Sequence, residues 1–305
     1  MTVRQERALI GVIEGGGTRF VCAVGESAAA FVERTVVPTT DAATTLGECL
    51  QFFAAAAGRH GPIAALGIGC FGPLQLRSDA ANFGCLLSTP KAGWSGVSVL
   101  APFRAALGIP VVLDTDVGAA ARGELAVGAG RGLDSLAYVT VGTGIGGAVA
   151  PGDTASRAMH AEMGHLIVRR DARDAEFAGI CPFHGDCLEG LASGPAIRAR
   201  WGVELAALPS DHPGRAIIAG YIGQLAAAIA LLHAPHRLII GGGVMADGLM
   251  LPLVRESVLA WLGGYLPRLR DRDGIGSFIA APALGRDSAI AGAALMALDA
   301  VRLAR

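Results

Sequence analysis

The pattern that most restricts the possible folds is a strand–glycine–strand unit that occurs twice. Residues 9–24 contain two β-rich runs around the letters EGGGT at 14–18, which predicts a hairpin closed by a glycine turn. Residues 135–150 repeat this arrangement around GTG at 142–144, about 127 residues further along. The repeat predicts an internal duplication, with two similar halves that each open with a hairpin.

Strands and helices alternate after each hairpin. We predict further strands at residues 31–37, 64–70, 111–113, 238–240 and 278–280. We predict helices at residues 40–58, 97–107, 116–127, 195–201, 213–233, 248–262 and 288–304, and a long loop at 79–94. This alternation is typical of the α/β class. The 305 residues suffice for roughly two domains, which we expect at residues 1–115 with 288–305 and at residues 116–287.

Charge and composition exclude several functions. The 25 basic and 26 acidic residues leave no positive excess for nucleic acid or a membrane surface. Lysine occurs once, at Lys91, outside the glycine setting that a Walker-type P-loop requires. Residues 1–8 carry Arg4, Glu6 and Arg7 and no long apolar run follows them, unlike a signal peptide. The uncharged stretch 216–235 is alanine-rich, which favours a core helix over a membrane span. We therefore expect a cytoplasmic protein.

Three glycine-rich loops follow predicted strands, at residues 15–18, 142–147 and 241–244. Glycine lets backbone N–H groups approach a phosphate closely, and Thr18 adds a hydroxyl. Each loop alone could be a plain turn, but three in one chain favour a nucleotide site. The letters GTGIGG at 142–147 match the dinucleotide-binding spacing, but a strand follows where that motif needs a helix.

Two aspartates, Asp114 and Asp116, directly follow the predicted strand at 111–113 and precede a helix. A carboxylate at the end of a strand can take a proton from an attacking hydroxyl. Either aspartate could equally be the N-cap of the helix. Both interpretations remain open from position alone.

A candidate metal site lies in an aperiodic insert at residues 169–189. Cys181, His184 and Cys187 follow one another at x2 spacing, and His165 lies 16 residues upstream of Cys181. Two thiols and two imidazoles form a closed tetrahedral zinc set, and a metal can hold a segment that lacks an apolar face. The alternative is a loop of scattered thiols and imidazoles.

Taken together, the chain resembles the ROK family (repressors, open reading frames, kinases), and within it the zinc-containing bacterial fructokinases. The matching segments are IEGGGTRFVCAVG at 13–25, FGP at 71–73, TPKAGW at 89–94, TDV at 115–117, TGIG at 143–146, EMGH at 162–165, CPFHGDCLEGLASGP at 181–195 and GGGVM at 241–245. They run in order across nearly the whole chain. The zinc segment with GLASGP is highly specific, whereas the glycine loops alone are not.

The resemblance implies a two-domain actin-like ATPase (ribonuclease H-like) fold with an interdomain cleft and a zinc-binding insert at residues 165–189. It implies a fructokinase that phosphorylates fructose to fructose 6-phosphate with ATP, and Asp116 as general base. Kinases of glucose, mannose or an N-acetylhexosamine are alternatives, and so is a non-catalytic sugar sensor, which would need no base at Asp116.

The resemblance also implies ligand contacts. The sugar contacts would be Glu162, His165 and Glu189, together with Thr89 and Lys91, although Lys91 could equally be a solvated loop residue. The nucleotide contacts would be Gly16, Gly17, Thr18, Arg19, Thr143, Gly144, Gly242 and Gly243. A structural zinc ion would be held by His165, Cys181, His184 and Cys187. Magnesium would accompany ATP, and the protein would be a homodimer.

Three positions depart from the usual pattern of the family. Gly118 stands where an Asn is usual, which removes one expected hydrogen bond to the sugar. Arg19 ends the first glycine loop in place of Lys and keeps its charge. Glu14 replaces the Asp that many members carry in this loop, as in the fructokinases that the chain resembles.

Overall fold

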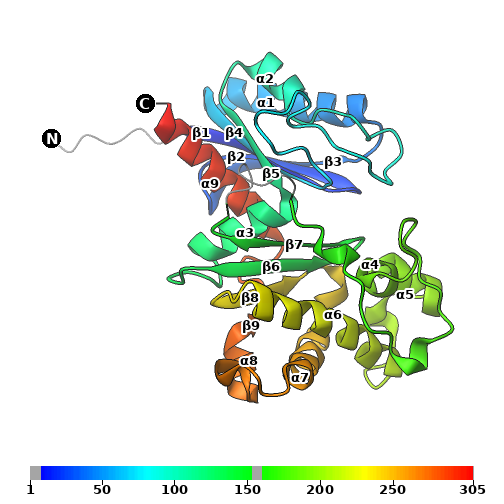
Figure 1. Ribbon diagram of the computed structural model, residues 1–305. Helices are drawn as coiled ribbons and strands as arrows, with labels where there is room; N and C mark the ends of the chain where they lie inside the picture. Colours follow the sequence, from blue (N-terminus) through cyan, green and yellow to red (C-terminus); the bar gives the residue numbers. More distant parts are fainter. Residues whose placement is uncertain (1–7, 153–159, 305) are drawn as a thin grey trace. The chain divides into compact units, whose positions relative to one another are not determined.

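The computed structural model describes residues 8–152 and 160–304 (Figure 1). The chain forms two compact units, residues 1–128 with 152–160 and 286–305, and residues 129–151 with 161–285. The sequence-based division lay at residue 115, whereas the first unit continues through Gly128. Residues 1–7, part of the stretch on which the expectation of no signal peptide depends, lie outside the described residues.

A five-stranded sheet forms the centre of the first unit. Its strands are β1 (Leu9–Gly15), β2 (Arg19–Ser27), β3 (Ala30–Pro38), β4 (Ile63–Cys70) and β5 (Val111–Thr115), in the order β3-β2-β1-β4-β5. The pairs β1/β2 and β2/β3 are antiparallel, and β4 and β5 continue parallel to β1. The first predicted hairpin is therefore confirmed as β1–β2.

Helices cover both faces of this sheet (Figure 1). They are α1 (Ala42–His60), α2 (Ala101–Leu107), α3 (Asp116–Val127) and α9 (Ser288–Leu303). Along β1, Ile13 packs in the cluster that contains Phe53 of α1, while Ile10 and Val12 pack against Ala293 of α9. Side chains alternate across a strand, so consecutive apolar residues in a doubly covered sheet bury on opposite faces.

Helix α3 belongs to the first unit because it packs tightly on α9. A Cβ atom added at Gly292 would lie 1.7 Å from the carbonyl oxygen of Ala119, and one added at Gly123 would lie 2.3 Å from that of Ser288. The buried Glu124 accepts a hydrogen bond of 2.7 Å from the Ser288 hydroxyl. Because of this packing, the boundary between the two units lies after Gly128 and not after residue 115.

The second unit repeats the topology with four strands. They are β6 (Leu136–Val141), β7 (Ile145–Ala150), β8 (Arg237–Gly241) and β9 (Ile279–Ala280), in the order β7-β6-β8-β9. As in β2-β1-β4-β5, an antiparallel hairpin is followed by two parallel neighbours. The strand order and directions agree with the predicted duplication.

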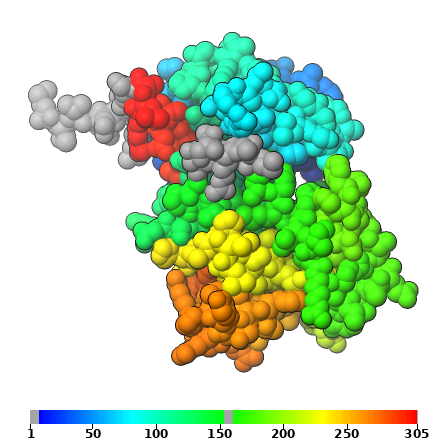
Figure 2. Space-filling model, in the orientation of Figure 1, coloured from blue at the N-terminus to red at the C-terminus, as the bar shows by residue number. Residues whose placement is uncertain are grey.

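The helices of the second unit enclose a single apolar core. They are α4 (Leu188–Ala192), α5 (Gly194–Trp201), α6 (Pro213–Leu232), α7 (Met250–Leu262) and α8 (Arg272–Phe278). Figure 2 shows yellow atoms of α6 beside orange atoms of α7 and α8. Among the described residues, α6 alone has the length and apolar composition to cross a membrane, and 67% of that stretch is buried inside the protein, as in a core helix.

Several elements differ from the expectation. Helix α8 was not predicted, α4 begins in the last two residues of the segment expected to be aperiodic, and α2 begins at Ala101 instead of residue 97. The segment 79–94 is irregular, as expected. Short 3-10 turns occupy η1 (Met163–His165), η2 (Ala172–Asp174), η3 (Leu205–Ala207), η4 (Gly243–Met245), η5 (Pro267–Leu269) and η6 (Gly285–Asp287).

Candidate functional site

In the first unit, the carboxyl ends of three parallel strands meet at one edge of the sheet. The register pairs Gly15 of β1 with Cys70 of β4, and Cys70 with Thr115 of β5. The first glycine loop, the Phe71 loop and Asp116 therefore leave the sheet at the same edge. Ligands of open α/β sheets bind at such an edge.

The first glycine loop connects β1 to β2. The Gly16 N–H donates to the Arg19 carbonyl at 2.9 Å, and the Thr39 hydroxyl donates to the Gly16 carbonyl at 2.7 Å. Gly17, Thr18 and Arg19 are exposed, so the loop presents backbone N–H groups and a hydroxyl to solvent. This geometry suits a phosphate.

Lys91 supports the same loop through Thr39. Its Nζ donates to the Thr39 carbonyl oxygen at 3.1 Å, and its backbone N–H donates to the Thr89 hydroxyl at 3.3 Å. Lys91 is half-buried and is not simply solvated. Trp94 closes this segment, since its Nε1 donates to the Thr40 carbonyl at 2.9 Å and its ring is fully buried.

Neither aspartate at the end of β5 is the N-cap of α3. The cap is Thr115, whose hydroxyl accepts the Gly118 N–H at 3.0 Å. Asp116 is the first helical residue, and its Oδ1 accepts the Val117 N–H at 2.8 Å. Asp114 accepts the Thr115 N–H at 2.7 Å. No side chain of the described residues hydrogen-bonds the Asp116 carboxylate, so it keeps an oxygen for a substrate.

Gly118 has no room for a side chain in this arrangement. A Cβ atom there would lie 2.6 Å from Oδ1 and 2.7 Å from Oδ2 of Asp114. The Asp114 carboxylate therefore occupies the space that an Asn side chain at position 118 would need.

Burial controls the electrostatics of this edge. It raises the pKa of Asp116, and it raises the pKa of Glu14 at the end of β1 to about 7, with the negative charge of Asp116 as the next cause. His160 lowers the pKa of Asp116 in part, and its Nε2 accepts the Leu74 N–H at 2.9 Å. His160 could not be predicted from the sequence, because nothing in its local pattern links it to β5.

In the second unit, the two other glycine loops lie side by side. The register pairs Thr140 of β6 with Gly241 of β8. Gly242 has a φ of 96°, and a Cβ atom on it would lie 2.3 Å from the Val141 carbonyl oxygen. Thr143, Gly242 and Gly243 are exposed. The structure thus brings together the predicted contacts of these two loops on one surface.

The loop at residues 142–147 is held by segments around the zinc motif. The Gly194 N–H, at the start of α5, donates to the Gly142 carbonyl at 2.7 Å. The Ile145 N–H donates to Glu189 Oε2 at 2.8 Å. A Cβ atom on Gly164 would lie 2.0 Å from the Ile145 carbonyl oxygen. The N–H and the carbonyl of Ile145 are therefore both in contact with these segments.

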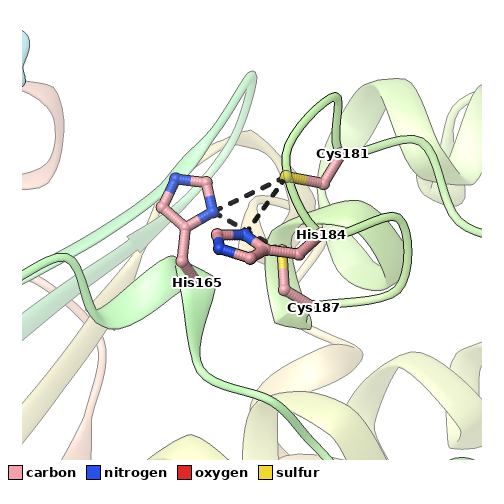
Figure 3. Close-up of side chains that lie close together, drawn as sticks. All are labelled: His165, Cys181, His184 and Cys187. Atoms are coloured by element: carbon pink, nitrogen blue, oxygen red, sulfur yellow. Dashed lines mark hydrogen bonds between the residues drawn. The ribbon is translucent and has the colours of Figure 1, made fainter. Parts of the chain in front are cut away.

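The four predicted zinc ligands converge (Figure 3). Their donor atoms all lie within 4.8 Å of one another. His165 Nδ1 lies 3.7 Å from Cys181 Sγ and 3.5 Å from Cys187 Sγ, and His184 Nδ1 lies 3.6 Å from Cys181 Sγ. Tetrahedral zinc with its usual bond lengths separates nitrogen and sulfur ligands by about 3.5 Å. The donor set and its spacing therefore fit zinc.

Burial disfavours the thiolate form that a metal ion requires. Burial, followed by the neighbouring Cys181 thiol, raises the pKa of Cys187 to about 11. A bound metal ion would offset this cost, because it deprotonates a coordinating thiol.

The predicted sugar contacts of the second unit lie around this cluster. His165 Nε2, on the ring edge away from the thiols, lies 4.0 Å from Glu189 Oε1. Glu162 is exposed, and its carbonyl oxygen accepts the His165 N–H at 3.1 Å. His165 and Glu189 are each about 28–29% exposed, so a ligand can reach both side chains.

Comparisons with known proteins agree along the whole chain. The model of the ROK family matches residues 10–300. The fructokinase of Zymomonas mobilis subsp. mobilis is 38% identical over 302 residues, covering 98% of this chain and 99% of that protein. The fructokinase of Pediococcus pentosaceus is 36% identical over 297 residues, covering 96% and 99%. The crystal structure of the ROK hexokinase from Thermus thermophilus is similar with a TM-score of 0.75 at 25% identity, covering 96% of this chain and 99% of that chain.

Proposed function

The chain belongs to the ROK family, whose actin-like ATPase fold it shares, and we propose that it is a fructokinase that converts fructose to fructose 6-phosphate with ATP. The similarity to fructokinases at 36–38% identity over nearly the whole chain supports this substrate. The observation that carries the chemistry is the Asp116 carboxylate, which starts α3 without capping it and has no side-chain partner among the described residues.

Asp116 acts as the general base of the transfer. Its carboxylate takes the proton of the fructose 6-hydroxyl while that oxygen forms a bond to the γ-phosphorus of ATP. The bond from the γ-phosphorus to the β,γ-bridging oxygen breaks, and ADP leaves with that electron pair. A raised pKa makes Asp116 a stronger base than an exposed aspartate, as long as the pH keeps it ionised.

The glycine loops bind the nucleotide. Gly16, Gly17, Thr18 and Arg19 of the first loop, and Thr143 and Gly144 of the second, contact the phosphates. Gly242 and Gly243 lie along the adenosine. Magnesium accompanies ATP, because phosphoryl transfer needs its negative charge neutralised.

The sugar contacts come from Glu162, His165 and Glu189, with Thr89 and Lys91 on the first unit. Zinc at His165, Cys181, His184 and Cys187 is structural, because four protein ligands leave no open position for chemistry. When bound, it supplies a cross-link that fixes the side chain of His165. The enzyme works in the cytoplasm as a homodimer. Light scattering tests the dimeric state directly, because it measures the molar mass.

An ADP-release assay with a panel of hexoses tests the assignment. We expect the highest kcat/KM with fructose, and lower values with glucose, mannose and N-acetylhexosamines. A higher kcat/KM with one of these sugars would replace fructose as the substrate. Sugar binding without any ADP release would favour the non-catalytic sensor.

A further inference from the structure

The Glu189 side chain lies between the zinc cluster and a glycine loop. One carboxylate oxygen accepts the Ile145 N–H at 2.8 Å, and the other lies 4.0 Å from Nε2 of His165. His165 turns its Nδ1 toward both thiols. The path from the metal ligands to the loop at 142–147 thus passes through two side chains of the second unit.

The neighbouring glycines leave space for the Glu189 carboxylate between His165 and Ile145. Gly144 has no side chain where the carboxylate lies, since a Cβ atom there would be 2.7 Å from Glu189 Oε2. At the carbonyl end of the same residue, Gly164, the chain neighbour of His165, packs against the Ile145 carbonyl. The position of Ile145 therefore depends on Glu189 and Gly164, which both lie next to the metal cluster.

We propose that Glu189 is a positioning residue that couples zinc binding to nucleotide binding, which rests on the proposed role of residues 142–147 as a phosphate loop. Zinc on Nδ1 fixes the His165 ring and makes its Nε2–H more positive, and this attracts the carboxylate. The other carboxylate oxygen then holds the Ile145 N–H, which sets the backbone of the loop. Zinc thereby tightens nucleotide binding, and by linkage the nucleotide tightens zinc binding by the same factor.

The test measures the affinity for Mg-ADP by calorimetry, in the absence of sugar, for zinc-loaded and chelator-treated protein. We expect zinc removal to weaken ADP binding about 5- to 10-fold, a typical coupling between two sites. Glu189→Ala should bind ADP weakly in both states, with less than about a twofold effect of zinc. Glu176→Ala is the matched control, because Glu176 is an exposed carboxylate on the same insert. It should keep the zinc effect.

Two further measurements avoid the risk that the zinc-free protein unfolds. Starting from the zinc-loaded enzyme, saturating ADP should raise the zinc affinity measured at equilibrium by competition with a chelator, and Glu189→Ala should remove this effect. Gly144→Ala, which displaces the carboxylate, should remove it as well. An equal zinc affinity with and without ADP in the unsubstituted enzyme would overturn the coupling. So would a zinc effect that survives Glu189→Ala. Failure of the unsubstituted zinc-loaded enzyme to bind ADP would instead refute the proposed kinase function.

Discussion

Glu14→Gln tests the electrostatics of the strand edge that carries Asp116. Burial and the nearby Asp116 raise the pKa of Glu14 from 4.5 to about 7, while Arg19 lowers it in part. Between pH 4.5 and about pH 7, Glu14 is protonated in the folded protein but ionised in the unfolded chain. The contribution of Glu14 to the unfolding free energy is therefore fully present below about pH 4.5 and is lost as the pH rises through about 7.

The magnitude follows from the two pKa values. One pKa unit is worth about 1.4 kcal/mol, so the rise from 4.5 to about 7 corresponds to about 3.5 kcal/mol at most. Glu14 is only half-buried in its strand, and screening by solvent lowers the effect to about 1–2 kcal/mol. Gln has the same shape and no charge, so Glu14→Gln should lack this loss.

Urea unfolding at about pH 5 and about pH 8 measures the difference. Between these conditions, the unsubstituted protein should lose about 1–2 kcal/mol more unfolding free energy than Glu14→Gln. Glu26→Gln, which removes an exposed carboxylate of β2, should follow the unsubstituted protein. The same loss in Glu14→Gln and the unsubstituted protein would refute the reasoning.

Two further substitutions test the packing and the metal site. Gly292→Ala should destabilise the protein by about 3 kcal/mol, because the new methyl would meet the Ala119 carbonyl at 1.7 Å. Gly47→Ala in α1 meets open space and should instead gain about 0.5–1 kcal/mol; equal unfolding free energies for the two variants would contradict the packing. Cys187→Ser should lower the zinc content measured by atomic absorption, and an unchanged content would reject Cys187 as a ligand.

The local patterns in the sequence predicted much of the fold. Glycine turns between β-rich runs mark both hairpins. Helix α8 was missed because it is short and contains Gly274 and Gly276, which lower helix propensity. Its stability comes from burial of Ile275 and Phe278, which depends on the tertiary fold.

The candidate site divides in the same way. The spacing of Cys181, His184 and Cys187 is local, so the sequence predicted the cluster. The contact of Glu189 with Ile145 spans 44 residues, and the pairing of β1 with β4 and β5 brings Glu14 to the edge of Asp116. Such contacts depend on strand register, which a single sequence does not specify.

The most direct test of the proposed kinase is the turnover of Asp116→Ala with fructose and Mg-ATP. Fructose binding, followed by calorimetry, should stay within about threefold, while kcat should fall by about 10²- to 10⁴-fold because the general base is gone. Asp79→Ala, at an exposed carboxylate of the first unit, should keep normal turnover. Fructose phosphorylation by Asp116→Ala at the rate of the unsubstituted enzyme would contradict the assignment of the base.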